Sequence, residues 1–193
     1  MARTPSTMLD LGTIAPDFSL PDAVSGKQIS LTDFKDCQGL LVIFLSCHCP
    51  FVKHVRAEFA RIAKDYLPKN IGIVGISPNN VEKYPDDAPE FLKAMAEEES
   101  FNFPVCYDET QEVAKAYRAA CTPDYYLFDS NMKLVYRGQL DDSRPSLDIA
   151  VTGADMRRAL DALLAGEEIN PDQKPSLGCN IKWIPGNEPD YFG

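Results

Sequence analysis

Two short apolar runs, with a helical pattern between them, constrain the fold of this chain more than any other feature. Residues 40–45 (LLVIFL) and 71–77 (IGIVGIS) are almost continuously apolar, which is typical of strands buried on both faces of a sheet. Between the runs, apolar residues recur at steps of three and four. This spacing predicts a helix from about Pro50 to Tyr66 with one buried face, formed by Val52, Val55, Phe59, Ile62 and Tyr66. The order strand, helix, strand predicts a right-handed crossover between parallel strands.

Weaker patterns extend this unit in both directions along the chain. They predict, in order, a hairpin around Ser25–Gly26, two short helices on either side of a strand at 103–107, a second hairpin around Ser130–Asn131, and a closing helix that ends at Gly166. This alternation favours a mixed α/β sheet with helices on both faces. The tail after Gly166 is rich in proline and glycine but contains apolar residues, so we expect it to pack on the domain: Ile181, Trp183 and Ile184.

Length and composition predict one globular domain. With 193 residues, of which 45% are hydrophobic, the chain can bury a core of ordinary size. We expect a single domain over residues 1–193, with an N-terminal hairpin at about 11–36, a core at about 37–166 and a C-terminal tail at 167–193.

Charge and hydropathy exclude several classes of function. A net charge of −10 offers no basic surface to nucleic acid. No apolar stretch reaches the roughly 18 residues of a membrane span, and the first residues lack the order of a signal peptide. We therefore expect a soluble, cytoplasmic protein that binds neither nucleic acid nor membrane. Its six cysteines are too few and too scattered for a disulfide scaffold, so most should be free thiols.

The segment FLSCHCPFVKH (44–54) places two cysteines and a histidine where the first apolar run meets the predicted helix. Cys49 directly precedes Pro50, and proline is favoured in the first helical turn. The unpaired amides and the dipole at a helix start stabilise an anion, so they lower the pKa of a thiol and increase its nucleophilic thiolate fraction. His48 and Lys53 add positive charge if their side chains point the same way. Cys49 is therefore the candidate reactive residue, and the alternative is a buried, inert thiol.

Several motifs carry a resemblance to known families. The run FLSCHCPFVK (44–53) resembles the active-site segment of the thioredoxin superfamily, with Cys49 as the attacking cysteine and Val52 in place of the second cysteine. Cys121, Thr122, Pro123 and Asp124 resemble the loop whose cis-proline faces that cysteine. Two early runs, APDFSLPD (15–22) and QISLTDF (28–34), are similar to the opening of the alkyl hydroperoxide reductase and thiol-specific antioxidant ("redoxin") family. Three later runs resemble its peroxiredoxin-like subgroup: DETQEVAKAY (108–117), CTPDYYLFD (121–129) and PSLGCNIKW (175–183).

This resemblance covers nearly the whole chain and implies a thioredoxin fold, that is, a mixed central sheet flanked by helices, with an N-terminal β-hairpin and a C-terminal extension. The site departs from both templates. A typical peroxiredoxin has threonine where this chain has Ser46 and arginine where it has Pro123, although Ser46 could partly replace the threonine. A typical thioredoxin resolves its mixed disulfide with a cysteine where this chain has Val52.

If Cys49 reacts, its partner cysteine must come from elsewhere, and three candidates are open. The resemblance brings Cys121 against the start of the active helix, so Cys121 is preferred. Cys47 is two residues away, where a disulfide ring would be strained and readily reduced. Cys179 could reach the site only if the tail folds over it. The other two cysteines, Cys37 and Cys106, have no such surroundings and are assigned to packing or surface.

The same cluster could also be drawn as a metal site, because cysteine and histidine bind zinc or copper: Cys47, His48, Cys49 and His54. Adjacent residues at a strand end diverge, however, and there is no second Cys/His pair at the spacing of a zinc finger. We therefore expect no metal and no other cofactor.

Together the patterns predict a thiol-disulfide oxidoreductase in which Cys49 is the attacking thiolate. Thr122 and Pro123 are expected to hold an incoming chain in extended form, and the other predicted substrate-binding residues are Ser46, His48 and Pro50. The expected partners are a disulfide or hydroperoxide substrate and a thiol reductant, either a thioredoxin-like protein or a low-molecular-weight thiol. A homodimer is compatible with these patterns. Two alternatives stay open: a peroxiredoxin-like thiol peroxidase that reduces hydroperoxides, and a non-catalytic binding or metal-carrier module.

Overall fold

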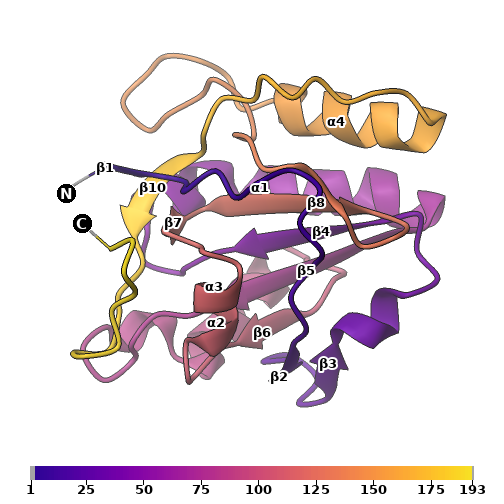
Figure 1. Cartoon of the computed structure of the whole chain (residues 1–193). Helices are drawn as coiled ribbons and strands as arrows, with labels where there is room; N and C mark the ends of the chain where they lie inside the picture. The colour runs from indigo at the N-terminus through magenta and orange to yellow at the C-terminus, as the bar shows by residue number, and fades with distance from the viewer. Residues whose placement is uncertain (1–2, 193) are drawn as a thin grey trace.

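A five-stranded sheet forms the centre of the computed structural model, which describes residues 3–192. Its order is β6-β5-β4-β8-β9, in which β4 (Gly39–Phe44), β5 (Ile71–Ser77) and β6 (Val105–Tyr107) are parallel, and β8 (Asp124–Asp129) and β9 (Leu134–Tyr136) are antiparallel. The helices are α1 (Pro50–Tyr66), α2 (Pro89–Glu98), α3 (Glu112–Ala116) and α4 (Ala154–Ala165). The predicted crossover from β4 through α1 to β5 is confirmed, as is the mixed sheet (Figure 1).

The side chains of β4 alternate between two apolar clusters, because successive residues of a strand point to opposite faces. Leu41 and Ile43 join the buried faces of α1, α2 and α4 on one side. Leu40 and Val42 join α3 and the N-terminal hairpin on the other. This two-sided burial explains why the strand reads as a continuous apolar run rather than as an alternating one.

The shorter elements follow the predicted order. The first hairpin pairs β2 (Ser19–Pro21) with β3 (Gln28–Ser30), and the second pairs β8 with β9. Helix α4 ends at Gly166, whose φ of 68° is the left-handed conformation that glycine adopts most easily. Three short 3₁₀ segments complete the chain: η1 (Leu31–Phe34), η2 (Leu67–Lys69) and η3 (Pro85–Asp87).

A second sheet of three short strands was not predicted. It has the order β1-β10-β7, in which β10 (Leu177–Asn180) lies antiparallel between β1 (Arg3–Pro5) and β7 (Cys121–Thr122). The two ends of the chain therefore meet beside the start of α1, at the left of Figure 1. The second sheet forms because the tail packs on the domain, as expected, and its strand β10 pairs with both β1 and β7.

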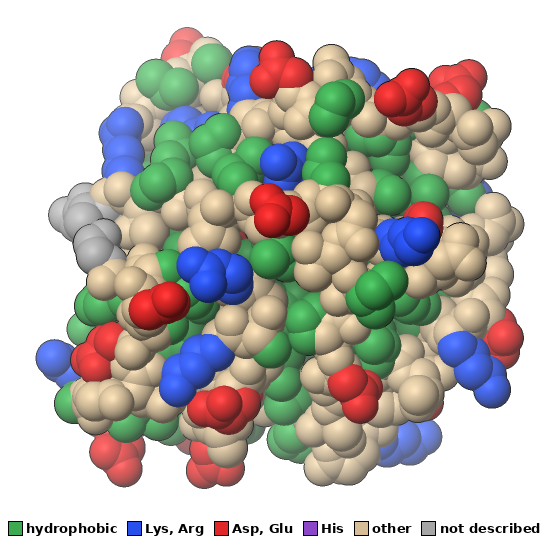
Figure 2. All heavy atoms as spheres, viewed as in Figure 1, with side chains coloured by type: hydrophobic (Ala, Val, Ile, Leu, Met, Phe, Trp, Pro, Cys, Tyr) green, Lys and Arg blue, Asp and Glu red, His purple; other side chains and the backbone are tan. Residues whose placement is uncertain are grey.

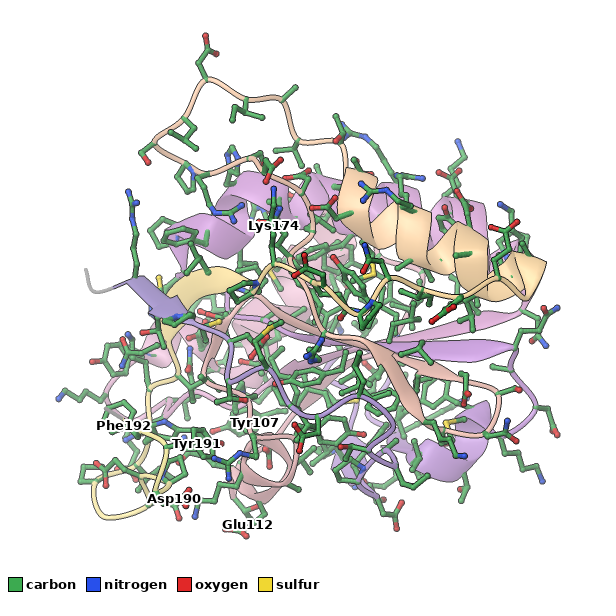
Figure 3. All side chains as sticks on the ribbon, turned by 45° about the horizontal axis from the view of Figure 1, so that its top comes forward. Tyr107, Glu112, Lys174, Asp190, Tyr191 and Phe192 are labelled. Carbon is green, nitrogen blue, oxygen red and sulfur yellow. The ribbon has the colours of Figure 1, made fainter. Side chains whose placement is uncertain are left out.

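The tail beyond β10 lies against α3. Ile181 and Trp183 are buried, whereas Ile184 is 38% exposed. The Tyr191 hydroxyl donates to the carbonyl oxygens of Ala114 and Ala119, and Figure 3 shows Tyr191 at this side of the molecule with its neighbours Asp190 and Phe192. These contacts hold the segment that follows β10 in a defined path.

The surface view shows how charge is distributed on one face. In Figure 2, Lys and Arg side chains are scattered among Asp and Glu rather than gathered into one basic patch. Across residues 3–192, every helix is too short or too polar to cross a bilayer.

Candidate active site

Cys49 lies at the junction between β4 and α1, as predicted. It is the residue that caps α1, its backbone is extended (φ −66°, ψ 122°), and Pro50 opens the helix. Its carbonyl oxygen accepts the Lys53 amide at 2.9 Å, which is the first hydrogen bond of the helical ladder. The side chain therefore faces the amide end of a 17-residue helix, but Cys49 is fully buried, with 0% exposure.

A second sulfur lies against Cys49. Cys179 on β10 places its Sγ 2.9 Å from Cys49 Sγ, and Cys179 is only 2% exposed. The register of the second sheet explains the contact, because Cys179 pairs with Thr122 of β7, whose carbonyl oxygen is 3.0 Å from Cys49 Sγ. The tail thus folds over the site, which was the condition set for Cys179 to reach it.

The two thiols affect each other's acidity in opposite directions. The Cys179 thiol donates a hydrogen bond that lowers the pKa of Cys49 to about 6, against burial, which raises it, and with help from the Thr122 side chain and the Val52 amide. The hydrogen bond to Cys49, burial and the negative charge of Cys49 raise the pKa of Cys179. Near neutral pH the pair therefore holds one proton, with the negative charge on Cys49.

Cys121, the preferred partner from the sequence, is held differently. Its thiol is fully buried and donates to the Pro123 carbonyl oxygen at 3.5 Å, and burial raises its pKa well above the usual value. Cys179 is therefore the cysteine whose sulfur contacts Cys49, whereas the Cys121 thiol bonds to Pro123. Cys121 was preferred because its loop faces the helix, but its neighbour Thr122 is the residue whose backbone makes that contact.

The Thr122–Pro123 peptide bond is cis, as the resemblance implied. The expectation that these residues hold an incoming chain stays a prediction, and the second sheet limits how such a chain could pair. The protein's own strand β10 pairs with β7 at the edge beside Cys49, so an incoming chain cannot pair there while β10 is in place. Ser176 also donates its hydroxyl hydrogen to the Pro123 carbonyl oxygen at 2.7 Å.

Gly178 allows β10 to approach this loop. A Cβ at Gly178 would lie 2.0 Å from the Thr122 carbonyl oxygen and 2.5 Å from the Thr122 carbonyl carbon, both of which are backbone atoms. Only glycine fits so close to another backbone. The glycine next to Cys179 therefore helps to set the distance between the two sulfurs.

The residues before Cys49 surround a buried carboxylate that sequence reasoning missed. Asp87, in η3, is fully buried and accepts hydrogen bonds from the Ser46 hydroxyl (3.0 Å), the Cys47 amide (2.6 Å) and the His48 amide (3.3 Å). It also accepts from Asn79 Nδ2 at 2.7 Å. Asp87 lies in a proline-rich loop some 40 residues from Ser46, Cys47 and His48, and no periodic pattern marks it.

His48 forms an ion pair with Asp87 at 2.6 Å through Nδ1, and its ring stacks on Tyr84. The hydrogen bond to Asp87 raises the pKa of His48. Burial alone would raise the pKa of Asp87, but hydrogen bonds from His48, Asn79 and Ser46 lower it. The pair therefore favours an imidazolium and a carboxylate close to Cys49.

The remaining predicted residues have clear positions. The Ser46 hydroxyl accepts the Cys49 amide at 3.3 Å, so Ser46 links Cys49 to Asp87. Cys47 is half-buried, and burial together with the charge of Asp87 raises its pKa to about 12. Of the cysteines assigned to packing, Cys106 is buried and Cys37 half-buried, and burial raises the pKa of both. Residues 3–192 contain no group of three or more His, Cys, Asp or Glu side chains arranged to hold a metal.

The fold and the buried cysteine pair define a thioredoxin-fold protein with thiol-based redox chemistry. The sequence profile of the AhpC/TSA family matches residues 11–137, which is more than half of the chain, and the chain belongs to this family. Peroxiredoxin Bcp of Escherichia coli (strain K12) is 36% identical over 110 residues, which cover 56% of this chain and 64% of that protein. Family membership and this relative identify the chain as an oxidoreductase.

Two solved structures extend the comparison. An uncharacterized conserved protein from Geobacillus kaustophilus is 53% identical, has a TM-score of 0.94 and covers 96% of this chain and 98% of its own. The match therefore includes most of the C-terminal extension. The thioredoxin domain of a thiol-disulfide oxidoreductase from Bacteroides vulgatus is 25% identical, has a TM-score of 0.56 and covers 67% of this chain and 91% of its own.

Proposed function

We propose that the protein is a two-cysteine thiol-disulfide oxidoreductase in which Cys49 and Cys179 alternate between a dithiol and a disulfide. The observation that carries the proposal is the 2.9 Å contact between the two sulfur atoms. Two buried thiols at this distance can form a disulfide with little movement of the backbone. The low pKa of Cys49 supports its role as the attacking thiolate.

The reaction with a disulfide would take two steps. The Cys49 thiolate attacks one sulfur of the substrate, forming a mixed disulfide, and the displaced thiolate takes up a proton. The Cys179 thiol then loses its proton and attacks Cys49 Sγ, which releases the second substrate thiol and leaves the Cys49–Cys179 disulfide. One disulfide is reduced and one is formed, so atoms and electrons balance.

The second step depends on a change in Cys179. Its hydrogen bond to the Cys49 thiolate and the charge of that thiolate raise its pKa, and both are lost when Cys49 becomes a neutral mixed disulfide. The charge of Lys182 and the hydrogen bond from the Phe51 amide lower the pKa of Cys179, and once the opposing effects of Cys49 are lost the pKa of Cys179 should fall. Cys179 becomes nucleophilic when its attack is needed. A cellular thiol, either a thioredoxin-like protein or a low-molecular-weight thiol in the cytoplasm, would restore the dithiol.

A second candidate is a thiol peroxidase that uses the same pair. Peroxiredoxin Bcp of E. coli supports it by its name, and the burial of both sulfurs favours a small substrate. Cys49 would attack the hydroperoxide to give a sulfenic acid and an alcohol, and Cys179 would displace water from the sulfenic acid. The position of the usual arginine is occupied by Pro123, which weighs against this candidate.

Disulfide mapping by mass spectrometry after mild oxidation tests the proposal. The reduced protein and its Cys49→Ser, Cys179→Ser and Cys121→Ser variants are treated in parallel with oxidised glutathione and with stoichiometric hydrogen peroxide. We expect a Cys49–Cys179 link that Cys121→Ser retains and the other two variants lose. A link from Cys49 to Cys121 or Cys47 would contradict the assignment.

The rates with the two oxidants separate the candidates. Faster oxidation of Cys49 by glutathione disulfide favours the oxidoreductase, and peroxide oxidation far above the rate of an ordinary thiol favours the peroxidase. Full reductase and peroxidase activity in Cys49→Ser would exclude both and leave the binding or metal-carrier module.

A further inference from the structure

Asp87 is connected to both segments of the chain that carry the reactive cysteines. These segments are far apart in sequence, since Cys49 and Cys179 are separated by 130 positions. Asp87 itself lies on neither segment, but on η3 between β5 and α2. It is fully buried, and its two oxygens accept all of the hydrogen bonds described above. So many donors around one carboxylate stabilise its charged form.

The first connection leads directly to Cys49. Asp87 Oδ1 accepts both the Cys47 amide and the Ser46 hydroxyl, and that same hydroxyl accepts the Cys49 amide. The turn between β4 and α1 is thus hydrogen-bonded to the carboxylate at successive residues. These bonds set the position at which Cys49 enters the helix.

The second connection leads to the strand of Cys179. Asn79 donates to Asp87 Oδ2 through Nδ2, and its Oδ1 accepts the amide of Lys182 at 2.8 Å. Lys182 follows Cys179 by three residues. The amide of Asn80 donates to the Lys182 carbonyl oxygen, so both backbone groups of Lys182 are tied to the loop after β5. The position of β10 is therefore coupled to the same carboxylate.

The charge of His48 completes the network. Asp87 pairs with Nδ1, the Tyr84 ring covers one face of the imidazole, and the charge of Cys49, the residue before α1, raises the pKa of His48. Lys182, in the tail, carries a positive charge that lowers the pKa of His48. It lies over the same Tyr84 ring. Asp87 thus pairs with a histidine whose charge interacts with that of Cys49.

We propose that Asp87 is a positioning residue for the proposed reaction: it fixes the Cys49 turn and, through Asn79, the Cys179 strand, and it holds His48 as a cation through their ion pair. This inference rests on the proposed function of the Cys49–Cys179 pair. No contact links Asp87 to either sulfur among the described residues, so its action passes through its hydrogen-bond partners.

The test compares Asp87→Asn with Asp86→Asn, a matched control whose carboxylate is exposed. Three quantities are measured on protein shown to be folded: the pH dependence of Cys49 alkylation, the rate of Cys49–Cys179 closure after oxidation, and the pKa of His48 by proton NMR. The chain has only two histidines, so His54 serves as an internal reference. A merely structural role would not change the pH dependence of alkylation or the His48 pKa.

In Asp87→Asn we expect the midpoint of Cys49 alkylation to rise by about one pH unit, because a neighbouring cation is lost. The His48 pKa should fall, and closure should slow about tenfold, because the two sulfurs are less well aligned. Asp86→Asn should match the wild-type protein. Wild-type behaviour of Asp87→Asn in all three measurements would overturn the proposal.

Two further variants keep the test valid if Asp87→Asn does not fold. His48→Gln removes the cation and keeps the carboxylate, so it should raise the alkylation midpoint with little change in closure. Asn79→Ala breaks the connection to Lys182, so it should slow closure and leave the His48 pKa near its wild-type value. If both variants behave as wild type, the proposal fails.

The two proposals can fail separately. Absence of a Cys49–Cys179 disulfide in the wild-type protein would remove the proposed function, yet the alkylation and NMR measurements would still report on Asp87. Conversely, a normal disulfide in wild type that closes equally fast in Asp87→Asn, with unchanged alkylation and His48 pKa, would leave the function and reject the role of Asp87.

Discussion

Burial and hydrogen bonding act in opposite directions on the cysteines of this protein. Cys47, Cys106 and Cys121 lose solvent, and burial raises the pKa of each. Cys49 is fully buried, but donors from Cys179, Thr122 and Val52 outweigh burial and lower its pKa to about 6. The helix start alone therefore does not explain the acidity of Cys49. The acidity depends on which groups the fold brings to it from elsewhere.

Asp124 provides a prediction at the same scale. It is fully buried at the start of β8, and burial raises its pKa to about 7, although Tyr126 and the Tyr125 amide hydrogen-bond to it. Between pH 4 and 7 the unfolded chain has released this proton while the folded protein keeps it. Through this group, the free energy of unfolding falls as pH rises, by up to ~1.4 kcal/mol per pH unit.

Asp124→Asn should remove that dependence. Urea denaturation at pH 5 and pH 8 tests this. Between these two values the free energy of unfolding should fall less in the variant than in wild type, so the variant should compare more favourably with wild type at pH 8. All other titrating groups are common to both proteins, so the difference isolates Asp124. Parallel stability curves for the two proteins would show that Asp124 does not retain its proton.

The sequence predicted the position of Cys49 and Pro50, because a strand that gives way to a helix at a proline is a local pattern. It kept Cys179 as a candidate partner but preferred Cys121, because the contact of Cys179 with Cys49 depends on the register of a four-residue strand 130 positions away. Asp87 was missed for a similar reason. Its partners lie across a loop without periodicity, and nothing in PDDAP distinguishes a buried carboxylate from an exposed one.

Among the elements, β10 is the one that brings the second sulfur to the site. Gly178→Ala should push β10 away from β7, because the new Cβ would meet the Thr122 backbone. We expect a loss of about 2–3 kcal/mol in the free energy of unfolding, measured with urea, and slower Cys49–Cys179 closure.

Gly12→Ala is the control for Gly178→Ala. Nothing lies within 4 Å of its added Cβ, and only its φ of 84° is unfavourable. Gly12→Ala should lower the free energy of unfolding by about 1 kcal/mol and leave the rate of Cys49–Cys179 closure unchanged. If Gly178→Ala and Gly12→Ala have the same effects, the close approach of β10 to the loop does not control the site.

Helices α1 and α4 are joined by an ion pair between half-buried Arg157 and buried Glu58. Arg157 binds Glu58 Oε1 through Nε (2.8 Å) and a terminal nitrogen (2.7 Å), and Glu58 is only 2% exposed. Arg157→Ala should lower the free energy of unfolding by ~2 kcal/mol, because it leaves a buried carboxylate with one exposed partner, Arg61. Arg158→Ala, which removes the pair of an exposed arginine with half-buried Asp155, should change the free energy of unfolding by less than ~0.5 kcal/mol.

The sequence predicted the long elements better than the short ones. The strands β4 and β5 and helix α1 span six to seventeen residues, enough for a pattern to repeat. The strands β1, β7 and β10 span two to four residues. They are strands only because they pair with one another, and such pairing leaves no signal within any one of them.

In the whole molecule, oxidation should change stability. A Cys49–Cys179 disulfide would join residues 130 positions apart, and the chain-entropy estimate for such a loop is about 5 kcal/mol. We expect the oxidised protein to resist urea more than the reduced protein, by up to that amount. Cys179→Ala should abolish the difference, and Cys121→Ala should retain it. An oxidised protein that unfolds more easily would mean that the disulfide distorts the surrounding sheet.

The second sheet also determines when the site is assembled. During synthesis, Cys49 leaves the ribosome 130 residues before Cys179, a delay of roughly 7 to 26 seconds at ordinary rates of translation. Throughout that interval the first cysteine lacks the donor that makes it acidic. In the proposed mechanism, the late strand therefore supplies the hydrogen bond that lowers the pKa of Cys49.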